Sequence, residues 1–428
     1  MKILRVMGIC VVTSVMIMLF LSGLDYVFSN DTTSWSRIEL HELYGQEEID
    51  SLFLGASHVY SGINPDIADA AWGQNTFNCS TSAQRIDTSY LLLKEANRVA
   101  DIDNCYLELS VNGVTRGVED GTLQEICRVS DYMRPSWNKF VYLWTTIQPQ
   151  DYINVFCRAR RNWKSVYSLQ TMKETVSAKW TAAYRNYEYV KVESGDYAGK
   201  GFIRFKEEFE NVGARVRQPI RENLVNEEFR YYFHEIAQYC QENNIRLVCF
   251  SAPLPEYTLE SFGNYDEYYM QAKELCEENG VCFYDFNMAN PSILGMQDTD
   301  FRDSTHMNEM GAERFTKVFA DFFAGKIEEE ELFYASYEEK KEQLPERFIG
   351  LILRRDTSGE FCKIRSVTTK KDKFKFEVYY EDDNGECTLL QEKSRNRKIA
   401  LPSAEKINIK VCVFDSQDNQ VGKYDKIV

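Results

Sequence analysis

The residues best suited to chemistry lie in two short motifs that are far apart in the chain. One of them is Asp303-Ser304-Thr305-His306, in which a carboxylate comes three residues before an imidazole. An Asp in this position can orient the His ring, fix its tautomer and stabilise its charged form. The whole chain has four His, so there are few other candidates for a general base. The motif therefore predicts a histidine that transfers a proton.

The second motif is Leu54-Gly55-Ala56-Ser57-His58, in which a serine directly follows a hydrophobic run that predicts a β-strand. A neutral serine hydroxyl is a poor nucleophile and needs an adjacent base. In an open parallel sheet, active groups gather beyond the carboxyl ends of the strands, so Ser57 and His306 are expected at one edge. His58, in a segment expected to be extended, would point away from Ser57 and is assigned to site shaping or substrate contact.

Each motif also has a purely structural interpretation. Ser57 could cap the helix that follows it, Asp303 could be a turn residue, and His306 could be a partly buried histidine with its hydrogen bonds satisfied. Taken together, at matching ends of an α/β sheet and in this order, the two motifs favour catalysis.

Short apolar runs alternate with amphipathic stretches from residue 49 onward. The expected strands are DSLFLGAS, NTFNCS, CYLELSV (105–111), IRLVCFSAP (245–253) and VCFYDF (281–286), and the expected helices cover residues 85–99, 222–243, 266–279 and 308–324. This alternation predicts an α/β domain at residues 31–325 with a doubly wound parallel sheet. Residues from about 113 to 221 break the rhythm and are interpreted as an insertion. Its basic run at 157–164 is interpreted as a solvated face.

The first thirty residues predict a membrane anchor. Residues 6–24 contain no charged side chain, and Lys2 and Arg5 precede them. As a helix, these nineteen residues would rise about 28 Å, enough to cross a hydrocarbon core. The basic flank predicts a cytoplasmic N-terminus, a single pass through the cell membrane, and everything after Asp25 outside. A cleaved signal peptide is the competing interpretation.

The C-terminal part of the chain changes character. Residues 326–344 are expected to form an acidic helical linker. From residue 345 to 428 the chain has 17 Lys and Arg against 14 Asp and Glu, although the whole chain has a net charge of −16. Apolar and polar residues alternate there around Asp-Asn-Gly and Asp-Asn-Gln turns, which predicts a separate small β-sandwich.

The composition excludes some partners and cofactors. A net charge of −16 argues against nucleic-acid binding, which needs concentrated Lys and Arg. The twelve Cys form no CxxC pair, so neither a zinc site nor a compact disulfide framework is expected. Cys249, Cys282 and Cys412 lie in apolar runs, where a thiol is expected to behave as a small core residue. No metal and no cofactor are predicted.

Three segments resemble SGNH/GDSL-type hydrolases: GASHVYSGINP, NCSTSAQRIDTSYLLLKEA and DSTHMNEMGAERF. They are most similar to the cell-surface branch that includes teichoic-acid D-alanylation protein D and the alginate O-acetylation proteins. The resemblance covers roughly residues 48–112 and 222–322, and the DxxH motif is its most specific part. It implies a flavodoxin-like, SGNH-type α/β domain in which Ser57 is the nucleophile and Asp303 and His306 complete a triad.

The oxyanion positions of that family match less well. Its second block supplies a glycine N–H, whereas residues 78–84 of this chain have Ser80 and Ala83 where glycine is expected. A backbone N–H survives such a change, so the N–H groups of Ser57 and Ser80 are the expected donors. Asn112 is the candidate for the third-block Asn, but Val111-Asn112-Gly113 equally fits a turn.

The expected function is therefore that of an extracytoplasmic serine esterase or O-acyltransferase acting on a cell-envelope polysaccharide or a teichoic-acid-like polymer. Transfer would need an acyl donor delivered across the membrane, which implies a membrane-bound acyltransferase as partner. The alternative is a non-catalytic envelope protein that binds glycan or an assembly partner, and the altered glycine block keeps this alternative open.

Overall fold

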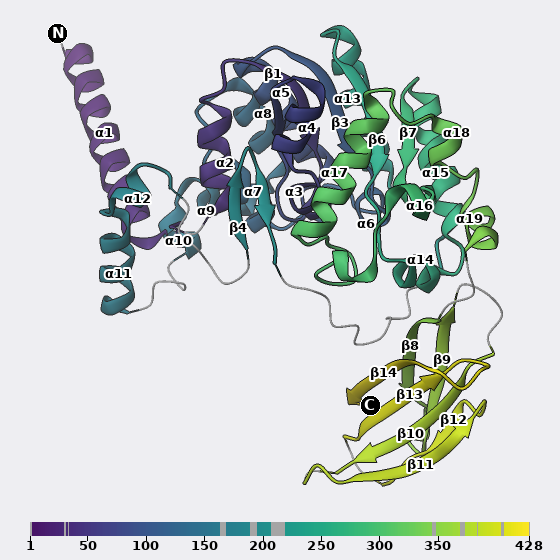
Figure 1. Ribbon diagram of the computed structural model, residues 1–428. Helices are drawn as coiled ribbons and strands as arrows, with labels where there is room; N and C mark the ends of the chain where they lie inside the picture. Colours follow the sequence, from purple (N-terminus) through teal and green to yellow (C-terminus); the bar gives the residue numbers. More distant parts are fainter. Residues whose placement is uncertain are drawn as a thin grey trace.

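The computed structural model describes residues 2–29, 31–32, 34–162, 168–188, 195–206, 219–344, 348–368, 373–382, 384–403 and 406–427. A five-stranded parallel sheet in the order β2-β1-β3-β6-β7 lies at its centre (Figure 1). The strands are β1 (Ile49–Leu54), β2 (Thr76–Asn78), β3 (Ile102–Glu108), β6 (Arg246–Ser251) and β7 (Cys282–Asp285). The predicted parallel α/β sheet is confirmed. Counted within this sheet, the strand order is 2-1-3-4-5, which is one of the two common doubly wound orders.

Helices cover both faces of the sheet, so the last four residues of each of the central strands β1, β3 and β6 are buried. On one face, α5 (Ile86–Val99), α13 (Glu227–Glu242) and α15 (Tyr265–Glu278) contribute to the larger hydrophobic core. On the other, α4 (Pro65–Trp72) packs against α17 (Glu309–Phe323), whose Phe315 and Phe319 meet the aromatic residues of the strands.

The insertion forms a set of short helices followed by a hairpin. They are α6 (Val111–Val114), α7 (Leu123–Ser130), α8 (Trp137–Thr146), η1 (Pro149–Asp151), α9 (Tyr152–Phe156), α10 (Arg158–Asn162), α11 (Leu169–Lys179) and α12 (Ala182–Arg185), then β4 (Asp196–Gly199) and β5 (Phe202–Arg204). The hairpin returns to the sheet: Asn78 N donates to Lys200 O at 3.0 Å. Gly201 has φ +80°, and a Cβ there would lie 1.7 Å from Asn78 O, so a glycine allows this close approach. Residues 163 and 164 of the predicted basic run lie outside the described residues.

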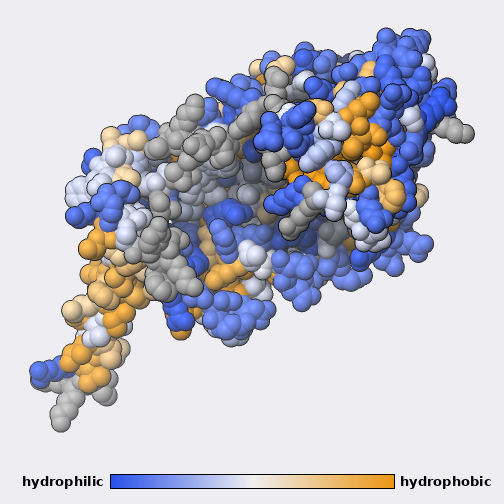
Figure 2. Space-filling model, turned by 90° about the horizontal axis from the view of Figure 1, so that it is seen from below, coloured by the Kyte–Doolittle hydropathy of each residue, from blue (hydrophilic) through white to orange (hydrophobic). Residues whose placement is uncertain are grey.

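The N-terminal helix α1 (Lys2–Phe28) projects from the rest of the molecule as an apolar rod (Figure 2). Arg5–Phe28 is long and apolar enough to cross a membrane. The helix continues past the predicted residues 6–24 to the segment that leads into α2 (Trp35–Leu43).

Two short helices, α18 (Glu329–Leu332) and α19 (Tyr337–Gln343), occupy the segment expected to be a linker. They pack on the α/β domain: Leu332 and Tyr337 are buried in its two cores. Lys340 is also buried, and its Nζ lies 2.6 Å from Glu256 Oε1. The segment is therefore part of the α/β body and does not bridge two domains freely. The predicted boundary at residue 345 lies outside the described residues.

The C-terminal part consists of antiparallel strands in two sheets, β11-β10-β13-β14 and β12-β9-β8, that share one hydrophobic core. The strands are β8 (Phe348–Arg355), β9 (Phe361–Thr368), β10 (Lys375–Glu381), β11 (Cys387–Ser394), β12 (Lys398–Ala400), β13 (Asn408–Phe414) and β14 (Gln420–Ile427). The predicted C-terminal antiparallel β-structure is confirmed.

All twelve cysteines are free thiols. Cys249, on the inner strand β6, is buried as expected, and Cys412 is half-buried. Cys282 is exposed, so its prediction as a core residue was wrong. The reason is that β7 is the edge strand of the parallel sheet and its first residue is not covered.

Candidate active site

Ser57 lies at the carboxyl edge of the parallel sheet. The strand β1 ends at Leu54, and Ser57 is the first residue of the short helix α3 (Ser57–Gly62), so the expectation that the strand runs to Ser57 was wrong. A Cβ at Gly55 would lie 2.4 Å from Val59 Cγ2 and 2.8 Å from Glu108 Cβ. A glycine is therefore what allows the chain to turn this sharply between strand and helix.

His306 and Asp303 reach the same edge from the loop before α17. The Ser57 Oγ lies 2.7 Å from His306 Nε2. On the other side of the ring, His306 Nδ1 lies 2.8 Å from Asp303 Oδ2 and 2.9 Å from Oδ1. The side chains of His306 and Asp303 are 29% and 38% exposed. The three residues thus form one hydrogen-bonded chain that remains open to solvent.

Backbone contacts hold this loop in shape. Asp303 Oδ1 accepts hydrogen bonds from the N–H groups of Thr305, at 2.8 Å, and His306, at 2.9 Å. Arg302 N donates to His306 O at 2.9 Å, which closes the loop. Asn308 caps α17 by accepting from Gly311 N at 3.1 Å, as its position before the helix predicts. The carboxylate therefore orients both the ring and the backbone that carries it.

These contacts determine the charge state of Asp303. Burial by itself would raise the pKa of its carboxyl. The hydrogen bond and charge interaction with His306, together with the N–H groups of Thr305 and His306, outweigh burial and lower the pKa below its ordinary value. The carboxylate is therefore ionised at neutral pH and can stabilise a charged imidazole.

His58 does not lie in an extended segment, so that expectation was wrong, because β1 ends before it. It sits in the first turn of α3, and its Nδ1 lies 3.0 Å from Glu108 Oε1. The Glu108 side chain is 3% exposed, and the rings of His58 and His306 are 5.4 Å apart. A second histidine–carboxylate pair thus stands beside the first. Glu108 was missed, although it ends a strand at the same edge.

Ser80 is buried two residues after the end of β2, and its hydroxyl donates to Asn78 Oδ1. Asn78 in turn donates through Nδ2 to the carbonyls of Val59, at 2.9 Å, and Ile63, at 3.2 Å, and so ties β2 to α3. Asn78 was another residue that sequence reasoning missed. Among the described residues, no acceptor bonds the backbone N–H of Ser57 or Ser80.

A cavity of about 310 Å³ opens beside Ser80. Its walls include Trp35 from α2, Tyr60 from α3 and Arg128 from α7, together with Ser82 from the turn that follows β2. Phe205, which follows the hairpin, packs on both Trp35 and Tyr60 with ring centroids 6.2 and 6.4 Å away. The insertion therefore helps to build the wall of a cavity next to the serine-bearing helix.

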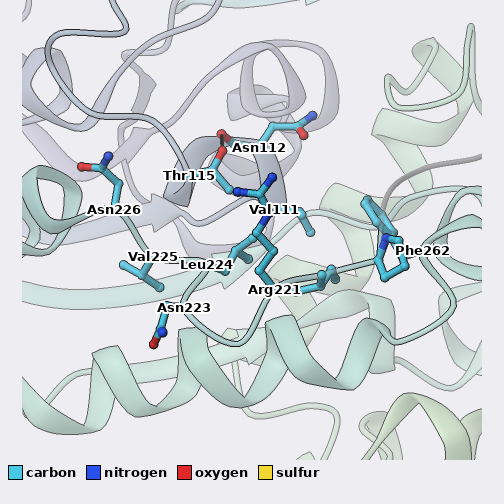
Figure 3. A pocket seen from close by; sticks show the side chains of 11 residues that line it. Val111, Asn112, Thr115, Arg221, Asn223, Leu224, Val225, Asn226 and Phe262 are labelled. Atoms are coloured by element: carbon cyan, nitrogen blue, oxygen red, sulfur yellow. Dashed lines mark hydrogen bonds between the residues drawn. The ribbon is translucent and has the colours of Figure 1, made fainter.

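Asn112 lies in the one-turn helix α6, whose first turn is capped by Ser110, and its side chain is exposed. It lines a cavity of about 20 Å³ together with His58 and Thr305, and also a larger one of about 610 Å³. Figure 3 shows this larger cavity, with the guanidinium of Arg221 pointing toward Asn112 and Thr115. The structure brings Asn112 close to His58 and to the His306 loop.

Within the described ranges, no group of three or more His, Cys, Asp or Glu side chains is arranged to hold a metal ion. No family model matches the chain, and no curated protein matches it. Among solved structures, a double mutant of the Cellulomonas fimi endo-beta-1,4-mannanase aligns over 94% of this chain and 98% of its own, at 9% identity and a TM-score of 0.16. A TM-score this low carries no argument about fold or function.

Proposed function

We propose that this chain is a membrane-anchored serine esterase or O-acyltransferase of the SGNH type. We further propose that it acts outside the cytoplasm on a cell-envelope polysaccharide or teichoic-acid-like polymer. The observation that carries the proposal is the hydrogen-bonded chain from Ser57 through His306 to Asp303, at the edge of a parallel sheet where active groups gather. The apolar helix α1 supports the membrane anchor.

In the proposed reaction, His306 Nε2 accepts the proton of Ser57 Oγ as Oγ bonds to the acyl carbon of the donor ester. The C–O bond of the donor then breaks, and the leaving alcohol takes the proton from His306. Water or a sugar hydroxyl next gives a proton to His306 and attacks the Ser57 ester, and Ser57 leaves with that proton. Asp303 stays ionised and stabilises the imidazolium in both halves.

The tetrahedral intermediates carry a negative charge on the former carbonyl oxygen. We assign its stabilisation to the backbone N–H groups of Ser57 and Ser80, which have no other acceptor in the described part of the chain. We assign an assisting role to Asn112, which shares a cavity with His58. His58, held by Glu108, contacts the substrate and does not replace His306 as the base.

The test is covalent labelling of the full chain in detergent micelles with a fluorophosphonate, which reacts with activated serines. Mass spectrometry should find the label on the peptide that contains Ser57. Ser57→Ala should abolish labelling, and His306→Ala should nearly do so, because the hydroxyl then lacks a base. An aryl acetate should also be hydrolysed, although a dedicated transferase turns over such an ester slowly.

The matched control is Ser304→Ala, which removes the serine of the other motif. The contact found for Ser304 is made by its backbone carbonyl, which accepts from Thr258, so labelling should persist. A wild-type chain that is folded but takes up no label on Ser57 would contradict the proposal and favour a non-catalytic envelope protein.

A further inference from the structure

Helix α8 is apolar on two opposite faces. One face is buried against α5 and the core through Tyr142 and Leu143. The other carries Trp137, Phe140 and Trp144, which are 75%, 53% and 66% exposed. Their spacing of three and four residues places them in one stripe along the helix. A surface helix of a soluble domain normally presents polar residues on its outer face.

The stripe continues into α9 as a row of stacked rings. The centroids of Trp137 and Phe140 are 5.2 Å apart, those of Phe140 and Trp144 6.3 Å, and those of Trp144 and Tyr152 6.2 Å. Helix α9 adds Ile153 and Phe156, which are 58% and 69% exposed. We call Trp137, Phe140, Trp144, Ile153 and Phe156 the aromatic face. A contiguous exposed apolar surface of this kind marks an interaction site.

The aromatic face is continuous with the segment that holds the end of α1. Helix α10 starts two residues after Phe156, and Ala159 N donates to Asp25 Oδ1 at 2.7 Å. From α11, the buried Lys179 donates to Tyr26 O at 2.9 Å and pairs with Asp31 at 3.2 Å. Figure 1 shows α9 and α10 between α1 and the parallel sheet.

We propose that the aromatic face is a second membrane contact, which rests in the headgroup region of the bilayer that α1 spans. The inference depends on α1 being a membrane span and is independent of the esterase chemistry. The last turn of such a span lies at the membrane surface, and α10 and α11 bind that turn directly. Trp and Tyr are enriched at this depth because their rings are apolar and their N–H or O–H groups need water.

Lipid is the occupant that these observations favour. Trp180 follows Lys179, the last residue of α11, whose side chain binds the end of α1. Its side chain is 69% exposed and adds a further ring suited to the membrane interface. The basic side chains of Arg134, Arg160 and Lys173 come from the same part of the chain and are exposed, and basic groups of this kind are attracted to lipid phosphates. A single helix leaves the domain free to rotate about its axis. A second contact would fix the direction in which Ser57 faces along the membrane surface.

The experiment uses the full chain reconstituted in phosphatidylcholine vesicles whose acyl chains are brominated near the headgroup. Bromine quenches tryptophan fluorescence at short range, and the chain has six Trp. The Trp137→Phe/Trp144→Phe variant keeps the apolar surface but should remove most of the quenchable emission. The matched control is Trp72→Phe, whose indole is tied to Ala320 O inside the domain, and the quenchable emission should be unchanged.

Two outcomes would overturn the inference. If the chain floats with the vesicles after an alkaline carbonate wash but the double variant keeps wild-type quenching, α1 is inserted and the aromatic face is not in lipid. A protein partner would then be the occupant. If the chain does not float, α1 is not a membrane span, and the inference fails for that reason. Neither outcome bears on fluorophosphonate labelling of Ser57, which tests the proposed function separately.

Discussion

Ser57, His306 and Asp303 are connected by short hydrogen bonds, so each side chain depends on the next. The hydroxyl needs the ring as its base, and the ring needs the carboxylate to hold its Nδ1 side. Glu108 and His58 repeat the carboxylate–imidazole pairing next to them, but no bond joins His58 to Ser57 among the described residues. This arrangement supports the proposal that His306, and not His58, takes the proton of Ser57.

Removal of the proposed nucleophile and removal of the proposed base should lower turnover to a similar extent. Ser57→Ala and His306→Ala are each expected to lower turnover of an aryl acetate by on the order of 10⁴ to 10⁶. The double variant should be hardly worse than either single one, because either change removes the whole pathway. Purified proteins with matched circular dichroism spectra would be compared. A double variant that is slower by the product of the two single effects would show that the residues act independently.

The low pKa of Asp303 predicts how pH acts on the site. The carboxylate stays ionised above its ordinary pKa of 3.8, so its protonation should cause no loss of activity between about pH 5 and pH 9. Asp303→Asn should lower turnover by on the order of 10⁴ across that whole range, because the ring loses its orienting charge.

The lowered pKa of Asp303 also predicts how the stability of the folded protein changes with pH. The folded-state pKa is depressed, so ionised Asp303 contributes stability that is complete above the unfolded pKa and is lost as pH falls toward the folded one. Urea unfolding below pH 4 should therefore show a smaller pH dependence in Asp303→Asn than in the wild type. If the free energy of unfolding depended on pH equally in both proteins, the pKa of Asp303 would not be lowered in the folded state.

At the scale of elements, the site depends on the turn from β1 to α3. Gly55 has no room for a side chain between Val59 and Glu108, and Asn78 ties α3 to β2. The hairpin β4–β5 is joined to α17 by the bond from Glu309 N to Phe205 O, at 2.7 Å. The insertion and the parallel-sheet domain together therefore position the wall of the cavity beside Ser80.

Gly55→Ala should displace α3, because the new Cβ would lie 2.4 Å from Val59 Cγ2 and 2.8 Å from Glu108 Cβ. Overpacking of this kind typically costs about 1–3 kcal/mol, and the shift of Ser57 should greatly reduce fluorophosphonate labelling. Gly45→Ala is the control, since a Cβ there would be 3.4 Å from Glu42 O, an ordinary contact. Normal labelling of Gly55→Ala would show that the turn tolerates a side chain.

At the scale of the whole molecule, the α/β body and the C-terminal β-structure have separate hydrophobic cores. The contacts between them are few and involve α14 (Glu256–Phe262) with β8 and β9. The residues of the candidate site all lie in the α/β body, as do the helices that hold α1. We therefore expect the hydrogen-bonded chain to form without the C-terminal part.

A chain that ends after residue 344 should fold and keep fluorophosphonate labelling of Ser57. It retains α19, whose Lys340 and Tyr337 are buried against the α/β body. Urea unfolding of the full chain should show two transitions, and the truncated chain should lack one of them. Loss of labelling on truncation, in a chain that still unfolds cooperatively, would show that the C-terminal strands support the site.

The local pattern of the sequence was enough to predict the apolar α1, the parallel α/β sheet and the loop that carries Asp303 and His306. These features depend on periodicity and on residues a few positions apart, such as the Asp three places before the His. The pairing of His58 with Glu108, the tie from Asn78 to α3 and the return of the hairpin to β2 were decided by the tertiary structure alone. They depend on β1 lying between β2 and β3, and neighbouring strands are chosen by packing of the whole domain rather than by any local pattern. The backbone conformation at His58 was mispredicted for the same reason: Gly55 packs without a Cβ between Val59 and Glu108, which is distant in sequence, and the turn at this glycine ends the strand three residues before Ser57.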